Sequence, residues 1–193
     1  EGMWSPVSGY IPSVCMHGAD PNGSQTAATM VIEYHDTKFK EMLYTYWGSM
    51  CPPCCSIIVP FYNTGYIPEK LAKGENVYSD DSFWWKVKRL VTDIESNYEK
   101  YIENLKAVRG DIEAKFYAEA KENEAKALEL LESGKKDEAC KLLNDFTDKC
   151  LDIAEKAYDK LIVEIEADMK VTPPQAYRKP YGDRLRERAK LNF

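Results

Sequence analysis

Residues 79–110 read SDDSFWWKVKRLVTDIESNYEKYIENLKAVRG, and this stretch decides the fold class. Its apolar residues recur in alternating steps of four and three, which places them along one side of a helix. They are Val87, Val91, Ile94, Tyr98, Tyr101, Leu105 and Val108. Ser79, Asp80 and Asp81 offer N-cap side chains and negative charge for the helix start. The pattern predicts a long helix that packs lengthwise on another helix.

The helical pattern continues past Gly110, a residue at which the helix could be interrupted, and ends at Ser133-Gly134. A second long helix is expected from about Asp137 to Met169, and Pro173 and Pro174 then stop it. Its apolar stripe is Ala139, Leu143, Phe146, Cys150, Ile153, Ala157, Leu161 and Ile165. Because the link at Gly134 is short, the two helices are expected to form an antiparallel hairpin.

The first 70 residues carry a different pattern, rich in proline, glycine, aromatic and β-branched residues. Alternation along the first predicted strand places Met30, Ile32 and Tyr34 on one face. Pro60 is expected at a strand end or on a sheet edge, and the continuous run 57–59 predicts cover on both faces. Short polar links favour antiparallel pairing, so the fold class is α+β. The predicted strands are 26–35, 42–47 and 56–62.

Three parts are therefore expected along the chain. Residues 1–78 form the sheet, residues 79–170 form the helical hairpin that packs on it, and residues 171–193 form a basic C-terminal tail. The tail is expected to become ordered by docking. Its basic residues are Arg178, Lys179, Arg184, Arg186, Arg188 and Lys190.

Composition excludes several partners. The chain has 193 residues with 32 acidic against 26 basic, a formal net charge of -6, so it has no reason to bind nucleic acid. No segment approaches the roughly 20 uninterrupted apolar residues of a membrane span, and the N-terminus does not read as a signal peptide. A cytoplasmic location is favoured, although the compartment stays open.

The segment 51–55, CPPCC, suggests a metal or redox site at first sight. A structural zinc site needs four ligands, and the remaining candidates are Cys15, His17 and His35. No second C-x-x-C or H-x-x-H pair completes the set, so a structural turn is favoured over zinc binding and thiol exchange. The six cysteines are expected to be mostly reduced, and neither a metal nor a cofactor is expected.

Other catalytic patterns are missing from the sequence. His17 and His35, the only histidines, could each act as a general base, but His35 at a strand end is expected to be a surface or turn residue. No G-x-S-x-G elbow or phosphate-binding glycine loop occurs. The carboxylates of the helices alternate with lysines, which is typical of a solvated face. The residues alone therefore define no self-sufficient active site.

Three blocks of sequence nevertheless resemble a known family. They are 13–17 (SVCMH) followed by 25–31 (QTAATMV), then 46–62 (YWGSMCPPCCSIIVPFY), and then 82–85 (SFWW) after a loop that carries 67–69 (IPE). In order and spacing, from about Ser13 to Leu90, they are similar to the C-terminal part of the cysteine-type dipeptidases related to dipeptidase A. The helical hairpin matches that family only in type.

This resemblance implies the N-terminal-nucleophile hydrolase fold (αββα), in which two stacked antiparallel sheets lie between helical layers. It also implies a metal-free dipeptidase for short peptides, whose nucleophile is a cysteine exposed as the first residue after leader removal. The free α-amino group then serves as the base for its own thiol, and nearby donors stabilise the oxyanion.

The chain departs from this family pattern at its start. Its first residue is Glu1, and its earliest cysteine, Cys15, lies inside a strand-like block. We therefore expect the nucleophile in an upstream N-terminal segment of the same protein and assign no catalytic residue within these residues. Segments 15–17 and 54–56 are expected near the sheet ends that face this segment. The apolar strand faces are expected to be covered by it or by a homo-oligomer.

Two alternatives stay open beside the dipeptidase reading. In the first, the chain is a protein-binding or assembly module that presents its helical hairpin and has no catalytic role. In the second, it is a zinc-binding module that uses Cys51, Cys54 and Cys55 with Cys15 or His17.

Overall fold

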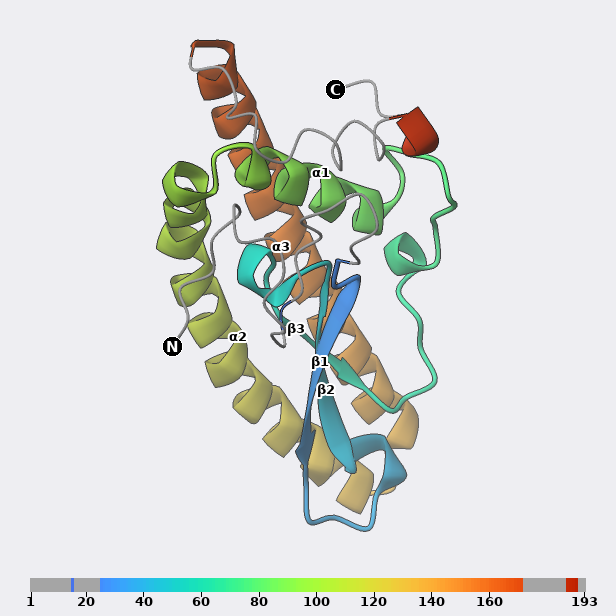
Figure 1. Cartoon of the computed structure of the whole chain (residues 1–193). Coiled ribbons are helices and arrows are strands. Elements are labelled where there is room, and N and C mark those ends of the chain that lie inside the picture. Colours follow the sequence, from blue (N-terminus) through green and yellow to red (C-terminus); the bar gives the residue numbers. More distant parts are fainter. Residues whose placement is uncertain (1–14, 16–24, 172–186, 191–193) are drawn as a thin grey trace.

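The computed structural model describes residues 15, 25–171 and 187–190, and within them the fold is α+β (Figure 1). The strands form an antiparallel sheet in the order β1-β2-β3, and the long helices lie behind it in this view. The strands are β1 (Ala28–Tyr34), β2 (Tyr44–Met50) and β3 (Val59–Tyr62). The helices are α1 (Phe83–Ser96), α2 (Tyr98–Glu132) and α3 (Lys136–Val171), and short 3-10 turns cover 40–42, 53–55 and 69–71.

The strands differ from the predicted ones mainly at their ends. β2 begins two residues later than predicted and continues through Gly48 to Met50, where Met50 still pairs with Ala28. The expectation that this strand ends at Trp47 is therefore wrong. Glycine fits at position 48 of this strand because the Tyr46 ring lies over it. A Cβ there would come within 2.4 Å of a ring carbon.

β3 begins at Val59, three residues later than predicted, because the residues before it bond to helices rather than to β2. Ile57 and Val59 are buried and Ile58 is half-buried, so the cover expected on both faces is complete only for the first two. Pro60 lies on an edge strand, opposite Trp47, as its missing N–H requires.

The two faces of the sheet have different surroundings. On the face toward the helices, Thr45, Trp47 and Ser49 of β2 are buried, and the Trp47 ring packs on Tyr117 of α2 with centroids 4.3 Å apart. On the opposite face, β1 residues lie directly across from alternate β2 residues, so they share that face. This outer face is defined by Met30, Ile32, Tyr34, Tyr44 and Tyr46.

The helix that the sequence predicts from Ser79 onward is two helices. The break falls at Asn97, whose φ of -151° and ψ of 76° leave the helical region. Gly110, where an interruption was considered, instead lies inside α2 in open space, and the helical pattern continues through it as predicted. The seam that was predicted across this break is confirmed at Val87, Val91, Ile94, Tyr101 and Leu105, which are all buried.

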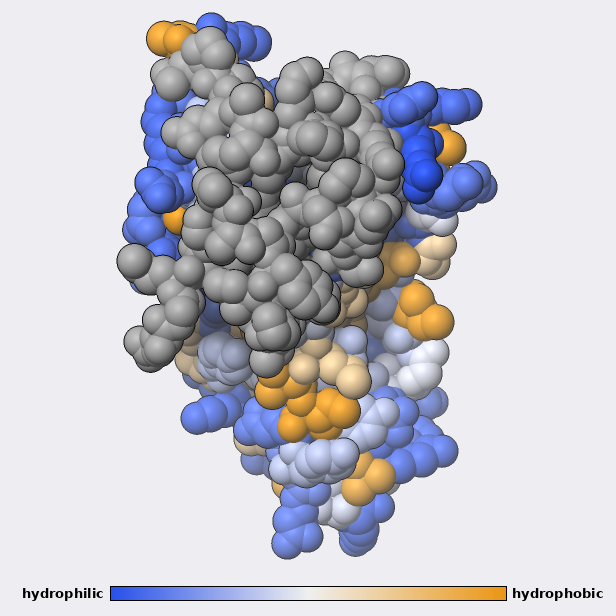
Figure 2. Space-filling model, viewed as in Figure 1, coloured by the Kyte–Doolittle hydropathy of each residue, from blue (hydrophilic) through white to orange (hydrophobic). Residues whose placement is uncertain are grey.

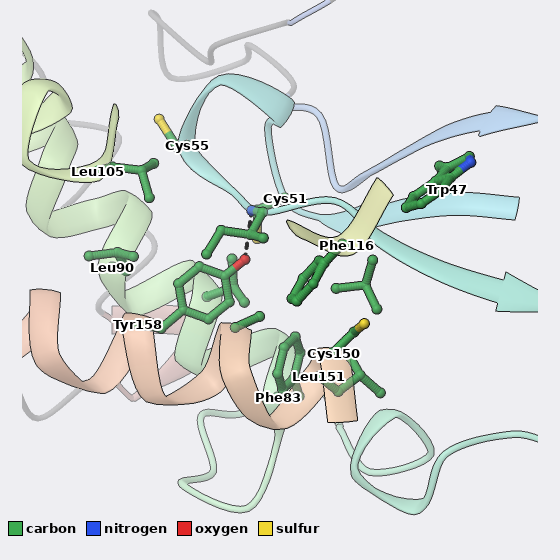
Figure 3. Packing of buried hydrophobic residues seen from close by; sticks show 14 of the residues in the cluster. Trp47, Cys51, Cys55, Phe83, Leu90, Leu105, Phe116, Cys150, Leu151 and Tyr158 are labelled. Carbon is green, nitrogen blue, oxygen red and sulfur yellow. Dashed lines mark hydrogen bonds between the residues drawn. The ribbon is translucent and has the colours of Figure 1, made fainter. Parts of the chain in front are cut away.

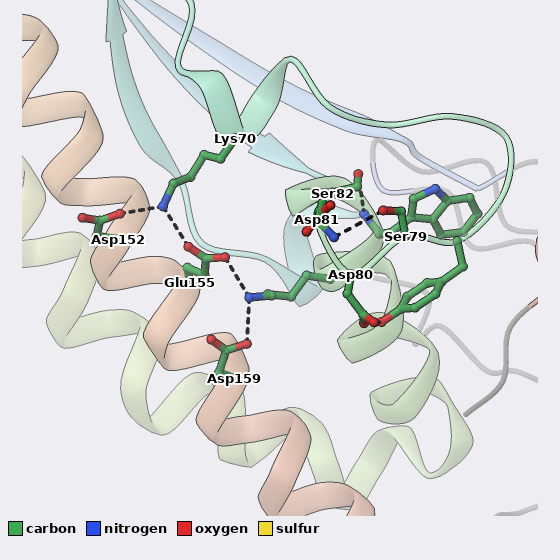
Figure 4. A network of polar contacts seen from close by, with 11 residues as sticks. Lys70, Ser79, Asp80, Asp81, Ser82, Asp152, Glu155 and Asp159 are labelled. Atoms are coloured by element: carbon green, nitrogen blue, oxygen red, sulfur yellow. Dashed lines mark hydrogen bonds and ion pairs between the residues drawn. The ribbon is translucent and has the colours of Figure 1, made fainter.

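The start of α1 is also later than expected. Ser82 is the N-cap, because its hydroxyl accepts the backbone N–H of Trp85 at 3.4 Å (Figure 4). Ser79, Asp80 and Asp81 form a turn before it, in which the Ser82 N–H donates to the Ser79 carbonyl at 3.2 Å. The expectation that these three residues cap the helix is wrong.

The hairpin of α2 and α3 agrees with the prediction. Gly134 takes a φ of 76° after the end of α2, and the Lys135 N–H donates to the Leu130 carbonyl at 2.8 Å. The apolar stripe of α3 is displaced in its middle, because Ala154 and Tyr158 are buried where Ile153 and Ala157 were expected. Burial along the rest of the stripe follows the prediction.

A lysine–carboxylate network ties the segment after β3 and helix α1 to α3. It consists of Lys70, Lys86, Asp152, Glu155 and Asp159, with N–O distances of 2.5–3.0 Å. In Figure 4, Lys70 reaches between Asp152 and Glu155, and Glu155 is shared by the two lysines. The network therefore joins the segment after β3, helix α1 and helix α3 to one another.

Most of the predicted basic tail lies outside the described residues. Within 187–190, Ala189 is buried and its carbonyl accepts the Tyr78 N–H at 2.9 Å. No helix among the described residues combines the length and the apolar character that a membrane crossing requires.

Candidate functional site

The β2–β3 turn (Cys51–Ile58) is the place where the chemically distinctive residues meet. Cys51 opens it with a φ of 64°, a conformation that few residues other than glycine adopt, and its N–H donates to the Ala27 carbonyl at 2.8 Å. A single 3-10 turn follows, because the Cys55 N–H and the Ser56 hydroxyl both donate to the Pro52 carbonyl, at 2.9 and 3.0 Å. Pro52 and Pro53 fix the backbone at the start of that turn.

Side chains from α2 and α3 hold the turn from below. The Ile57 N–H donates to the buried Tyr158 hydroxyl at 2.7 Å, and Figure 3 shows this bond beneath Cys51. The Ile58 N–H donates to the Glu113 carboxylate at 3.0 Å. Arg109 donates to the carbonyls of Pro53 and Cys54 at 3.0 and 2.8 Å. Backbone groups that no strand pairs are thus satisfied by helix side chains, as buried polar groups require.

A thiol cluster, consisting of Cys15, Cys54 and Cys55, lies on this turn. The sulfur of Cys54 is 3.4 Å from that of Cys15 and 3.4 Å from that of Cys55. Cys55 is fully buried, whereas Cys15 and Cys54 are half-buried. Tyr98, at the start of α2, hydrogen-bonds Cys54, and burial followed by the neighbouring thiols raises its pKa.

The zinc site that the sequence left open is not found among the described residues. Among the described residues, no group of three or more His, Cys, Asp or Glu side chains is arranged to hold a metal ion. All six cysteines are thiols. Of the other candidates, Cys51 lies apart from Cys55 in Figure 3, and His17 lies outside the described residues.

Beside the turn, helix α1 contributes a second polar group. Lys88, in the second turn of α1, and Glu95, in its last turn, are both buried, and Gln25 bonds to both of them. The Lys88 ammonium donates to the Gln25 carbonyl oxygen, and the Gln25 amide donates to the Glu95 carboxylate at 2.5 Å. Buried charges are costly unless they are paired through hydrogen bonds, which this arrangement supplies.

The electrostatics of the site favour protonated groups. Burial raises the pKa of the Cys51 thiol to about 12, although Lys88 opposes this, and a raised pKa disfavours the nucleophilic thiolate. Burial also raises the pKa of Glu113, against the effect of the Ile58 N–H and Arg109. Neither group forms the nucleophile–base pair that acyl transfer needs. The arrangement positions and stabilises a loop.

A cleft of about 530 Å³ opens next to this turn, at the start of α1. Met50, Lys73, Ser82, Trp84 and Trp85 contribute to its lining. The indole N–H of Trp84 donates to the Ala27 carbonyl at 3.1 Å, and that of Trp85 donates to the Glu75 carbonyl at 3.0 Å. The aromatic residues at the start of α1 therefore tie this helix to the segment just before β1 and to the loop that precedes α1.

The other histidine lies at the far end of the sheet. His35, directly after β1, is half-buried, and its ring nitrogen Nε2 lies 2.9 Å from the Thr45 hydroxyl. Thr45 in turn donates to Glu124 at 2.7 Å, and Tyr62 donates to the same carboxylate at 3.1 Å. His35 is thus a turn residue, as expected, but it belongs to a structural hydrogen-bond chain rather than to the surface.

Sequence reasoning missed the residues that hold the turn. Arg109 and Glu113 belong to charged helical segments that look solvated throughout, as does Lys88 of the neighbouring polar group, and Tyr158 lies one residue from the predicted stripe. One signal was available in the segment 56–58. Its backbone N–H groups are buried, so each of them needs a hydrogen-bond acceptor even where no strand pairs with it.

Comparison of the chain with protein-family models, with curated proteins and with solved structures gave no match.

Proposed function

We propose that this chain is the C-terminal, non-nucleophilic portion of a cysteine-type N-terminal-nucleophile dipeptidase that hydrolyses peptide bonds of short peptides. The nucleophile is the first residue of an upstream segment, and the present chain supplies part of the αββα fold around it. The proposal starts from the resemblance of the three ordered blocks. The single structural observation that carries it is the uncovered outer face of the sheet.

This outer face is apolar and exposed. Met30 is 61% exposed and Tyr34 79% exposed, and both project on the side away from the helices. Figure 2, viewed as in Figure 1, shows apolar side chains at the surface over β1. A sheet with an apolar face is stable when another layer covers it, and exposed patches of this kind mark interaction surfaces. A second sheet from the upstream segment is the layer that the αββα arrangement requires.

The outer edge of the sheet supports the same proposal. Within the described residues β1 pairs only with β2, so the opposite side of this strand presents its backbone N–H and C=O groups. Val31, whose side chain points to the other face, is also exposed. A bare edge strand with exposed apolar residues on both faces promotes pairing with another chain or segment.

The β2–β3 turn would serve such an enzyme as scaffold. The Glu113 carboxylate of α2 is engaged in holding the loop, and a nucleophile that carries its own α-amino base needs no histidine from this chain. The residues of the turn therefore shape the sheet end beside the incoming segment and take no part in proton transfer.

The first test is the composition of the native protein. Intact masses and N-terminal residues should be determined for everything that co-purifies with this chain, and the preparation should be assayed with dipeptides. We expect an upstream chain or continuous precursor that starts with Cys after processing, and Cys→Ala at that terminus should abolish hydrolysis. A 22.1 kDa chain that occurs alone and without dipeptidase activity would overturn the proposal.

A matched pair of variants tests the outer face in the complete polypeptide. Met30→Lys places a charge where the second layer should lie, whereas Val163→Lys changes a residue of α3 that is similarly exposed at 69%. A lysine forced into this contact buries an unpaired charge, and each 1.4 kcal/mol of that cost corresponds to a factor of ten. Dipeptidase activity should therefore fall roughly tenfold or more. Val163→Lys should leave it unchanged. Equal activity of the two variants would show that the outer face is not covered.

The same pair has an internal control in the 193-residue chain. Here both side chains are exposed, so each substitution should change the free energy of unfolding by less than about 0.5 kcal/mol. A large destabilisation by Met30→Lys in this chain would mean that the variant acts on folding and not on the contact with the upstream segment.

One observation favours the alternative function, a binding module without catalysis. A groove of about 510 Å³ runs between α2 and α3, and its walls include Ala107, Val108, Ile112, Ala157 and Leu161. An apolar groove between two helices can accept a partner helix. Under this alternative the native chain is stable without an upstream segment, and the mass measurement described above distinguishes the two functions.

A further inference from the structure

The thiol cluster has a geometry that neither the turn nor the proposed dipeptidase fold requires. Cys15 and Cys54 are 39 positions apart in the sequence, yet their sulfur atoms lie 3.4 Å from each other. Both side chains are half-buried, so a small oxidant can reach them. We propose that Cys15 and Cys54 are a reversible oxidation site, at which a peroxide converts the two thiols into a disulfide.

The turn holds one partner of this pair in place. Arg109 donates to the carbonyls of Pro53 and Cys54, and Tyr98 hydrogen-bonds the Cys54 side chain. A disulfide bond is about 2.05 Å long, so the sulfur atoms must approach by little more than 1 Å. Rotation of the Cys15 side chain toward a fixed Cys54 is enough to supply this movement.

The neighbouring pair, Cys54 and Cys55, is less suited to a disulfide although its sulfur atoms are equally close. A bond between adjacent cysteines closes a small ring that includes their peptide bond, and planar trans peptides resist the required distortion. That peptide belongs to the 3-10 turn, where the Cys55 N–H already donates to Pro52. Cys55 is also completely buried, so an oxidant does not reach its sulfur.

The chemistry balances with hydrogen peroxide as the oxidant. The thiolate of one cysteine attacks one peroxide oxygen, which breaks the O–O bond, releases hydroxide and leaves a sulfenic acid. The thiolate of the second cysteine then attacks that sulfur, the S–S bond forms, and hydroxide leaves. Together, two thiols and one peroxide give one disulfide and two waters. A small dithiol reverses the step by exchange.

The bond would tie residue 15 to the β2–β3 turn and close a loop that contains β1 and β2. The oxidation site does not depend on the proposed dipeptidase function, because it uses only contacts within this chain.

The experiment uses the positions of the lysines. Trypsin cleaves after Lys38, Lys40 and Lys70, so Cys15 lies in peptide 1–38 and the other cysteines of the turn lie in peptide 41–70. After hydrogen peroxide treatment of the native chain, we expect an intact mass lower by two hydrogen atoms and a cross-link between these two peptides. Dithiothreitol should restore both peptides.

Fragmentation of the cross-linked pair should locate the bond at Cys54, and Cys15→Ser or Cys54→Ser should abolish it. Cys140→Ser, at a half-buried cysteine on α3, should retain it. A disulfide confined to peptide 41–70 would overturn the assignment in favour of adjacent cysteines. Native chain in which Cys15 and Cys54 both remain open to alkylation after peroxide treatment would overturn the oxidation site itself. Neither outcome depends on the folding of a variant.

Discussion

Replacing Tyr158 with phenylalanine removes a single oxygen atom from the centre of the molecule. The Tyr158 hydroxyl accepts the Ile57 N–H at 2.7 Å, and both residues are essentially inaccessible to water. The ring itself is kept, together with its edge-to-face packing on Phe83, whose centroid is 5.9 Å away. The change therefore isolates one hydrogen bond between α3 and the β2–β3 turn.

The expected cost follows from what is left behind. Without the hydroxyl, the Ile57 N–H has no water to replace its partner, and a buried donor left unsatisfied costs about 1–3 kcal/mol. Little hydrophobic contact is lost, so no cavity term adds to this value. For a chain of this size, each kcal/mol corresponds to about 2–4 °C in Tm. Tyr158→Phe should thus lower Tm by several degrees.

Urea unfolding followed by circular dichroism measures this cost directly. Tyr66→Phe is the matched control, because Tyr66 also donates its hydroxyl to a neighbour, Asp148 at 2.7 Å, but on the exposed surface. That control should stay within about 0.5 kcal/mol of the parent. If Tyr158→Phe is no more destabilising than Tyr66→Phe, the Ile57 N–H has another partner, and the turn is not held by α3.

Three further predictions address a glycine pair, an acid transition and thiol exposure. Gly134→Ala should destabilise the chain by about 1–2 kcal/mol, since a φ of 76° is strained for alanine. Gly110→Ala should instead stabilise it by up to about 1 kcal/mol, because Gly110 lies in open space inside α2. A change in Tm of the same sign for both variants would contradict this. Burial alone would raise the pKa of Glu155, but hydrogen bonds from the two lysines of the lysine–carboxylate network lower it below 4.5. A carboxyl with a depressed folded-state pKa contributes stability that is present above its unfolded pKa and lost as pH falls through the folded value. Glu155→Gln should therefore cost about 0.5–1 kcal/mol at pH 7 and less at pH 3, and a cost that does not change with pH would argue against the pairing. Finally, burial raises the pKa of both Cys51 and Cys150 to about 12, so maleimide should not label them in the native chain at pH 8 but should do so in urea, and native labelling of either would refute this placement.

The sequence predicted the helices well because their core positions repeat with a fixed period. Val87 to Leu105 kept its periodicity across the break at Asn97, so the same residues are buried although the helix is not continuous. The break itself gave no signal, since asparagine is tolerated within helices and Gly110 is the weaker helix former. A break at Asn97 and a break at Gly110 differ in the tertiary contacts that they allow, and a local sequence pattern does not contain those contacts.

The site was less accessible to sequence reasoning, for a physical reason. A lysine or glutamate on a helix is read as solvated because a buried charge is costly, and most of them follow that rule. Glu103 and Lys106 do pair on the surface, at 2.7 Å, as their spacing predicts. Lys88 and Glu95 are residues of the same types on a similar charged helix, but they are buried. Gln25, from the segment before β1, forms hydrogen bonds with both of them. Only the folded chain brings these residues together.

The distribution of apolar surface distinguishes the two functions considered for this chain. The predicted stripes of the helical hairpin are largely consumed within the molecule, where Leu105 and Phe116 of α2 pack in the same buried cluster as Leu143 of α3. The alternating face of β1 was predicted from sequence with equal clarity, yet Met30 and its neighbours remain exposed. A helical hairpin that binds a partner through its apolar stripe would keep that stripe exposed. A sheet whose faces are both covered would not expose its apolar residues. A run of exposed apolar residues lies on β1, and this supports the proposal that a further strand-forming segment completes the fold.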